Sequence, residues 1–429
     1  MLSKPLVLAD PSMRHATFSI LASRWASRLV LKLSVFKDLM LSQGLKTGFK
    51  SVVRNFFLKM VTYSDRFLAL TGGRFGRPKR VPHLEHWSCP DAETYITGID
   101  YYEHPRLCRL KMAELYPQLE LPVPERDEPI PRPESLMNGG SSYVDEHGRR
   151  HVRWGDSLSN HWNWGELFKT PEDVFAFSPL KQGDFTNIPV VESRDYRDEE
   201  KLYREYRAHY PVEWGDEAPQ GSTASVSFYN TMFMWPLLTF GWRLFLRTCL
   251  DKRFERIMDE FAELSRRVFR VFARLPVNFV VCHDDIATSS GPILSPAWMR
   301  RHVFPRYREF WRILRDAGKT VIFMSDGCVD VFAEDVFACG AQGIITEPYT
   351  NIQAIAHKHP DVFLAGEGDC RILLRNDPVE IEKMVRRMVE TAKKAGGYAF
   401  CIGNHIPWNT PPQAVKLYLD LCAELGRLD

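Results

Sequence analysis

The sequence lacks the features of a disulfide-stabilised, membrane-spanning or repetitive protein. Its nine cysteines include no CxxC pair, and several lie inside apolar runs. We therefore expect reduced, buried thiols in a cytoplasmic protein, and neither a disulfide framework nor a thiolate zinc site. No apolar run reaches the ~18 residues of a transmembrane helix, and there is no internal repeat or low-complexity tract. These absences favour an ordinary globular protein, as does the hydrophobic content of 45%.

The chain has little net charge, but the charge is unevenly distributed. The formal net charge is +2 over 429 residues, so we expect no nucleic-acid partner. Residues 1–80 contain 15 Lys and Arg against 3 Asp and Glu, whereas the remainder contains 41 against 51. We predict that residues 1–80 form a basic helical extension. This extension could lie on an anionic membrane, dock on an acidic partner, or pack on the rest of the chain or on a second subunit of a homodimer.

One sequence pattern recurs five times in the second half of the chain. Each time, an apolar, β-branched run stops abruptly at a polar or charged residue, and segments with helical periodicity separate the runs. Continuous apolar runs indicate strands buried on both faces, and their alternation with helices indicates parallel pairing. The pattern predicts an α/β fold, a (β/α)8 TIM barrel at residues 81–429 with insertions around 120–220. The runs are 278–285, 320–327, 343–348, 362–369 and 398–405, and further strands are expected at 80–87 and 221–230.

The polar residues that end these runs are candidate site residues. In a TIM barrel the carboxyl ends of the strands face the active site. A charge buried there without a partner costs several kcal/mol, so it is expected mainly where it serves a site. The alternative is that these residues cap the helices that follow, as Asp and Ser often do. Because all five runs end in this way, we favour a shared site.

Several motifs after residue 278 carry a family resemblance. They are Asp284 to Pro296, Phe304 to Tyr307, Ser325 to Gly327, Glu347-Pro348, Gly366 to Asp369 and Gly403 to Pro412. Together they resemble the uroporphyrinogen decarboxylase superfamily, and the resemblance extends over about residues 80–425. It implies a TIM barrel with one of two activities: porphyrinogen decarboxylation, or methyl transfer linked to a corrinoid or to coenzyme M.

The chain departs from this family pattern in two places. The decarboxylases carry an arginine-rich motif that holds the carboxylates of the substrate, but the corresponding segment 82–87 contains Glu85 and no arginine. The thiol-activating zinc methyltransferases carry a His-x-Cys pair and a further Cys, where this chain has Met324, Asp326 and Asn404. What remains resembles the substrate-side methyltransferase of an ether-cleaving O-demethylase. This implies methyl transfer from a small methoxylated, aromatic substrate to the Co(I) corrinoid (cobalamin) of a partner protein.

The implied reaction needs a group that neutralises the oxygen of the leaving phenolate. Glu347, Glu367 and His405 follow three successive predicted strands, so they could bind zinc, or one glutamate could act as a general acid. Asp326 joins them as a catalytic candidate. A decarboxylase and a non-catalytic barrel that binds a corrinoid protein remain alternatives. The residues expected to bind substrate are His83, Tyr229, Asn230, Trp235, His283, Asp284, Asp285, Asn404 and Trp408, of which Tyr229, Trp235 and Trp408 would stack on an aromatic ring.

Overall fold

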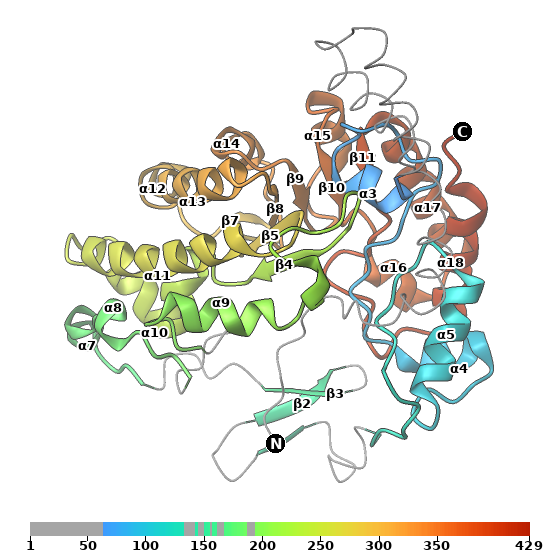
Figure 1. Ribbon diagram of the computed structural model, residues 1–429, viewed down its shortest axis with the longest axis horizontal. Helices are drawn as coiled ribbons and strands as arrows, with labels where there is room; N and C mark the ends of the chain where they lie inside the picture. The colour runs from blue at the N-terminus through green and yellow to red at the C-terminus, as the bar shows by residue number, and fades with distance from the viewer. Residues whose placement is uncertain (1–62, 133–141, 145–149, 155–156, 161–166, 187–193) are drawn as a thin grey trace, which may run out of the picture.

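The computed structural model describes residues 63–132, 142–144, 150–154, 157–160, 167–186 and 194–429. Its centre is a six-stranded sheet with helices packed around it (Figure 1). The strand order is β11-β10-β9-β8-β5-β4, and each of these pairings is parallel. The strands are β4 (Ser225–Phe228), β5 (Phe279–His283), β8 (Thr320–Met324), β9 (Gly343–Ile345), β10 (Phe363–Ala365) and β11 (Gly397–Tyr398).

All five predicted runs, and the predicted strand at 221–230, contribute to this sheet. The order of the strands in the sheet follows their order in the chain, as in a run of consecutive β/α units. The small antiparallel pair β6 (Ala287–Thr288) and β7 (Gly291–Pro292) lies outside the sheet. The predicted α/β fold is therefore confirmed, and it is consistent with a TIM barrel.

The segment predicted as the first barrel strand lies beside the last strand of the chain. His83 forms a parallel bridge with Phe400, and Trp87 forms one with Ile406. A first β segment next to the last one is the arrangement that closes a barrel. On its other side, no ladder joins segment 80–87 to β4 within the residues that the structure describes.

The two faces of the sheet belong to separate apolar clusters. Val280 and Phe323 lie in the large cluster that includes the surrounding helices, whereas Phe279, Ile322 and Ile345 lie in a smaller cluster built mainly from strand residues. We call the smaller one the inner cluster. Because successive side chains of a strand point to opposite faces, the position of a residue along its strand decides whether it faces the helices or the inner cluster.

Helix α3 (Asp65–Leu70) packs on the inner cluster where the strands begin. Phe67 meets Phe279, the first residue of β5, edge to face with ring centroids 5.9 Å apart. A Cβ on Gly397, the first residue of β11, would lie 1.9 Å from the carbonyl oxygen of Ala69, so only glycine fits there. The rest of the predicted basic extension, residues 1–62, lies outside the described residues.

Two consecutive helices stand where the sequence pattern favours one. The helical periodicity of residues 296–317 predicts a single helix, but the structure has two, α12 and α13, because Pro305 stands in the first turn of α13 and cannot continue a helix from before it. The helices are α4 (Pro90–Thr97), α5 (Pro105–Leu115), α7 (Pro171–Ala176), α8 (Pro179–Gln182), α9 (Glu199–Arg207), α10 (Met234–Thr248), α11 (Phe254–Arg274), α12 (Pro296–His302), α13 (Phe304–Asp316), α14 (Ala333–Cys339), α15 (Ile352–Lys358), α16 (Cys370–Arg375), α17 (Pro378–Lys394) and α18 (Pro412–Leu425), with a 3-10 turn η1 (Val212–Trp214).

A second, antiparallel sheet lies within the predicted insertion. Its strands are β1 (Ser142–Val144), β2 (Arg150–Trp154) and β3 (Ser157–Asn160), in the order β1-β2-β3. Tyr143 pairs with His151, so β1 and β2 are the two strands of an antiparallel hairpin. Within the described ranges, no helix combines the length and the apolar character needed to cross a membrane.

Candidate active site at the carboxyl ends of the strands

The carboxyl ends of β4 and β5 bring three predicted site residues together. His283 ends β5, and its Nε2 lies 3.0 Å from Oδ1 of Asp285. Tyr229 follows β4 and donates its hydroxyl to Oδ2 of Asp285 at 3.2 Å, while its ring centroid lies 4.0 Å from that of His283. In the alternation of β5, His283 occupies the same face as Phe279 of the inner cluster. These side chains therefore lie at the strand ends on the inner face.

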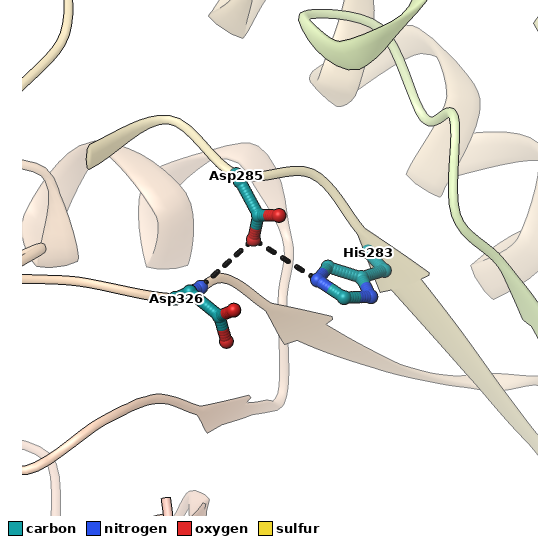
Figure 2. Close-up of side chains that lie close together, drawn as sticks. All are labelled: His283, Asp285 and Asp326. Carbon is teal, nitrogen blue, oxygen red and sulfur yellow. Dashed lines mark hydrogen bonds and ion pairs between the residues drawn. The ribbon is translucent and has the colours of Figure 1, made fainter. Parts of the chain in front are cut away.

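Asp326 completes this group from the next strand. It follows β8, the neighbour of β5, and its backbone N–H donates to Oδ1 of Asp285 at 2.9 Å. Figure 2 shows the three side chains of His283, Asp285 and Asp326 meeting between the two strand ends. Each offers one atom that can bind a metal ion, and these atoms lie within 4.8 Å of one another. In the part of the chain that the structure describes, no other group of His, Cys, Asp and Glu meets this criterion.

Glu347 adds a third carboxylate from the end of β9. Its Oε2 accepts a hydrogen bond from the backbone N–H of Gly327 at 2.7 Å, and its charge contributes to the raised pKa of Asp326. The amide of Asn404 donates to Oδ2 of Asp326 at 2.9 Å. Within the described residues, none of the carboxylates of Asp285, Asp326 and Glu347 pairs with a lysine or an arginine. The site carries a surplus of negative charge.

The pKa values of the two aspartates are shifted in opposite directions. Burial, and then the charge of Asp285, raises the pKa of Asp326 to about 7. Although burial opposes ionisation, the ion pair with His283 lowers the pKa of Asp285. Burial likewise opposes protonation of His283, but Asp285 raises the pKa of that imidazole. Near neutral pH, Asp285 is therefore ionised and paired with His283, whereas Asp326 is the carboxyl group that exchanges a proton.

Two further histidines lie beside this cluster. His405 forms a hydrogen bond through Nδ1 with the side-chain oxygen of Asn404. Burial, and then the charge of His86, lowers the pKa of His405 to about 4. The pKa of His86, an exposed residue, is also lowered, by desolvation and then by the charge of His283. The imidazole of His405 is therefore neutral at pH 7.

Sequence reasoning missed His86, although a signal was present. Leu84 packs against the inner cluster, and His86 is two residues further along the same extended segment. Side chains two apart in a strand share a face, so the alternation places His86 toward the site. Glu85, between them, points to the opposite side, where its carboxylate accepts a hydrogen bond from Tyr418 of α18.

Asp284 does not face the site, which corrects its predicted role in substrate binding. It is fully buried on the side of the helices. Its carboxylate accepts hydrogen bonds from the backbone N–H groups of Met232, Phe233 and Met234 at 2.8, 2.6 and 2.6 Å, and from the hydroxyl of Tyr307 at 2.6 Å. Asp284 therefore satisfies N–H groups at the start of α10, a helix that precedes it in the chain, and does not cap the helix that follows it.

Glu367 also points away from the site. Its Oε1 accepts from Nε of Arg387 on α17 at 3.1 Å, and its Oε2 accepts from the hydroxyl of Tyr398 at 2.9 Å. The preceding Gly366 has φ +97°, and a Cβ there would lie 1.7 Å from the carbonyl oxygen of Thr346. This left-handed residue interrupts the alternation of β10 and turns Glu367 toward the helices.

The zinc site predicted from Glu347, Glu367 and His405 is therefore not formed as expected. Glu367 is committed to Arg387 and Tyr398. The side chains that could hold a metal are instead those of His283, Asp285 and Asp326. Imidazole and carboxylate donors suit zinc, and they also suit Mn²⁺ and Fe²⁺.

The remaining predicted substrate-binding residues have different surroundings. His83 is buried, with its Nδ1 3.1 Å from Glu85 and its ring edge to face with Tyr418, so it belongs to the layer between strand and helix. Trp235 is fully buried, donates to Oγ of Ser265 at 2.8 Å and stacks on Phe261, so it is a core residue and cannot stack on a substrate. Asn230 is fully buried, and its amide atoms have no hydrogen-bond partner among the described residues. Trp408 lies in the loop after His405 and is 37% exposed.

The fold and the cluster define a class of protein: a parallel β/α protein with an acidic site at the carboxyl ends of its strands. Residues 244–425 match the family model described as Uroporphyrinogen decarboxylase (URO-D). The matched region contains His283, Asp285, Asp326, Glu347 and His405, but neither His86 nor Tyr229.

Two curated relatives agree with this match. They are the uroporphyrinogen decarboxylases of two strains of Thermus thermophilus, to which the chain is 26% and 25% identical over 174 residues. Each alignment covers 40% of this chain and 48% of the relative, so the chain matches about half the length of these proteins. The comparisons support a relationship to the uroporphyrinogen decarboxylase-like superfamily for this part of the chain.

Proposed function

We propose that the chain is a corrinoid-dependent methyltransferase, the first component of an O-demethylase system. Its substrate would be a small methoxylated aromatic compound, and the methyl acceptor would be the Co(I) corrinoid of a partner protein. The observation that best supports this choice is the surplus of negative charge at Asp285, Asp326 and Glu347, with no lysine or arginine paired to them in the described residues. A porphyrinogen carries many carboxylates, which such a site would repel, whereas an ether carries no charge.

The reaction breaks the bond between the methyl carbon and the ether oxygen. The corrinoid of the partner protein would supply the electron pair that takes up the methyl group, the electron pair of the C–O bond would stay on the oxygen, and the phenolate would then take up a proton. The developing charge on the oxygen must be neutralised by a proton or by a cation. Asp285 and Asp326 would hold this proton or cation. Burial and the charge of Asp285 raise the pKa of Asp326 to about 7, so its carboxyl group can carry a proton near neutral pH.

The other residues of the site would position these groups. Tyr229 holds Asp285 through its hydroxyl and packs against His283. Asn404 holds Asp326 through its amide. Removing either contact should leave the charged groups present but free to rotate, which lowers the rate by loss of geometry and not by loss of the reacting group.

The test follows the conversion of free cob(I)alamin to methylcobalamin by absorption under anaerobic conditions. Methoxybenzenes such as 2-methoxyphenol and 1,2-dimethoxybenzene serve as donors. We expect the wild type to methylate cobalamin with at least one of them, and Asp326→Asn to be slower by at least about 100-fold, the usual scale for loss of acid–base assistance. Equal rates in the two proteins would remove Asp326 from the reaction, and no turnover with any methyl ether would count against the whole proposal.

Decarboxylation of a porphyrinogen is the second candidate, because both curated relatives are uroporphyrinogen decarboxylases. The same protein should therefore be incubated with uroporphyrinogen III while the release of CO2 is measured. Release that depends on the wild-type protein would replace the methyltransferase proposal. We expect none, because the acidic site offers the substrate's carboxylates no paired cation.

A further inference from the structure

We infer that His283, Asp285 and Asp326 bind one divalent metal ion. His283 ends β5 and Asp285 lies two residues further along, whereas Asp326 follows the adjacent strand β8. Their candidate ligand atoms lie within 4.8 Å of one another (Figure 2). Bonds from zinc to nitrogen or carboxylate oxygen are about 2.0–2.2 Å long, so one ion placed among these atoms can reach all three after only small side-chain movements.

The charge of the site calls for a cation. Three carboxylates, those of Asp285, Asp326 and Glu347, lie near a single imidazole partner, His283. The described part of the chain supplies no lysine or arginine to any of them. Buried charges in proteins are normally paired or coordinate a metal. A divalent ion would supply the missing positive charge.

The three ligands are also held by neighbours in the way that metal ligands usually are. Oδ2 of Asp285 accepts from Tyr229, and Oδ2 of Asp326 accepts from Asn404. Such outer partners fix the orientation of the ligands. The ion would take the place of the proton between Nε2 of His283 and Oδ1 of Asp285, which lie 3.0 Å apart. The mixture of one nitrogen and carboxylate oxygens indicates a first-row ion such as Zn²⁺ or Mn²⁺ in preference to Ca²⁺.

A second histidine–aspartate pair in the molecule provides a matched control. Nδ1 of His104 lies 3.0 Å from Oδ2 of Asp127, the same separation as in the site. The side chain of His104 is 56% exposed. Among the described residues, no third His, Cys, Asp or Glu has a ligand atom within 4.8 Å of both members of this pair. If a His–Asp pair alone were sufficient, a metal ion would bind both at His283 and Asp285 and at His104 and Asp127. We expect binding only at the site with Asp326.

The experiment measures metal binding without substrate, so it can fail independently of the proposed methyl transfer. Only the role of the ion as a Lewis acid on the ether oxygen rests on the proposed function. Full-length protein is stripped with a chelator, dialysed, and titrated by calorimetry with ZnCl2 and MnCl2. Co²⁺ is added in a parallel titration, because its visible absorption reports the ligand set. We expect about one ion to bind per chain.

Three variants decide the assignment. His283→Ala and Asp326→Asn should each weaken binding by more than the ~10–100-fold that loss of an outer partner causes, whereas His104→Ala should bind like the wild type. Asp326→Asn keeps the size of the side chain and removes a like charge beside Asp285, so its unfolding midpoint without metal should not fall. A wild type that binds none of the three ions, or variants that bind as tightly as the wild type, would overturn the inference.

Discussion

The acidic residues at the strand ends divide into two regions that differ in the partners of their carboxylates. On the side of the helices, the buried carboxylates have several donors each: Asp284 has three backbone N–H groups and Tyr307, and Glu367 has Arg387 and Tyr398. On the inner side, Asp285 accepts from His283, Tyr229 and the backbone N–H of Asp326, and Asp326 accepts from Asn404, but here the two carboxylates lie beside each other. Asp284 and Asp285 are adjacent in the chain, yet they belong to different regions.

This difference separates structural from functional acids. A carboxylate that binds donors of the helix layer and has no second acid beside it holds those elements together, because its removal leaves the donors buried without a partner. A carboxylate held next to another one destabilises the fold and persists where a site requires it. The predictions below test this division, and they begin with the largest expected effect.

Asp284→Ala should destabilise the protein by about 3–5 kcal/mol, because it leaves three N–H groups and one hydroxyl buried without their acceptor. The free energy of unfolding from urea titration measures this. Asp285→Asn, one residue further along, is the matched control. It keeps an oxygen that can accept from Tyr229 and relieves the repulsion from Asp326, so it should cost less stability than Asp284→Ala, while abolishing metal binding. Equal destabilisation by the two substitutions would contradict the division.

Glu367→Gln should have a smaller effect, on stability and not on the reaction. It weakens the contacts with Arg387 and Tyr398, which we expect to cost about 1–3 kcal/mol. The measurements are the urea concentration at the midpoint of unfolding and the rate of cobalamin methylation without urea, where the variant is folded. A folded Glu367→Gln protein that has lost methyl transfer would return Glu367 to the site and contradict its assignment to the helix layer.

His405 should produce the smallest effect, a change in how stability depends on pH. Its pKa is lowered to about 4 by burial and by His86, whereas an unfolded histidine titrates near its ordinary value of 6.5. Between these values the unfolded state binds more protons, so this group's contribution to stability is present above pH 6.5 and is lost as the pH falls toward 4. Comparing urea midpoints of the wild type and His405→Gln across this range isolates the contribution of His405. Parallel pH curves for the two proteins would refute the shift.

Much of the architecture could be predicted because it depends on local patterns. Apolar runs of β-branched residues separated by helical periodicity predicted the strands of the main sheet, and the polar ends of those runs predicted that β5, β8 and β9 carry site residues. His283, Asp285 and Asp326 were all among the candidates. The wrong predictions concern the face of the sheet to which a side chain points. The site was predicted to include Asp284, Glu367, His83 and Trp235, but the structure buries these side chains on the side of the helices.

The sequence by itself determined which residues end the strands and that their charges would gather at one edge of a parallel sheet. Only the tertiary structure decided which of those charges meet. The physical reason is that strand alternation assigns faces only while the backbone stays extended. It fails at Gly366, which has φ +97° and lies against the carbonyl oxygen of Thr346, and at Asn404, with φ 65°. Such positions depend on neighbouring strands that are distant in the chain, so no local pattern reveals them.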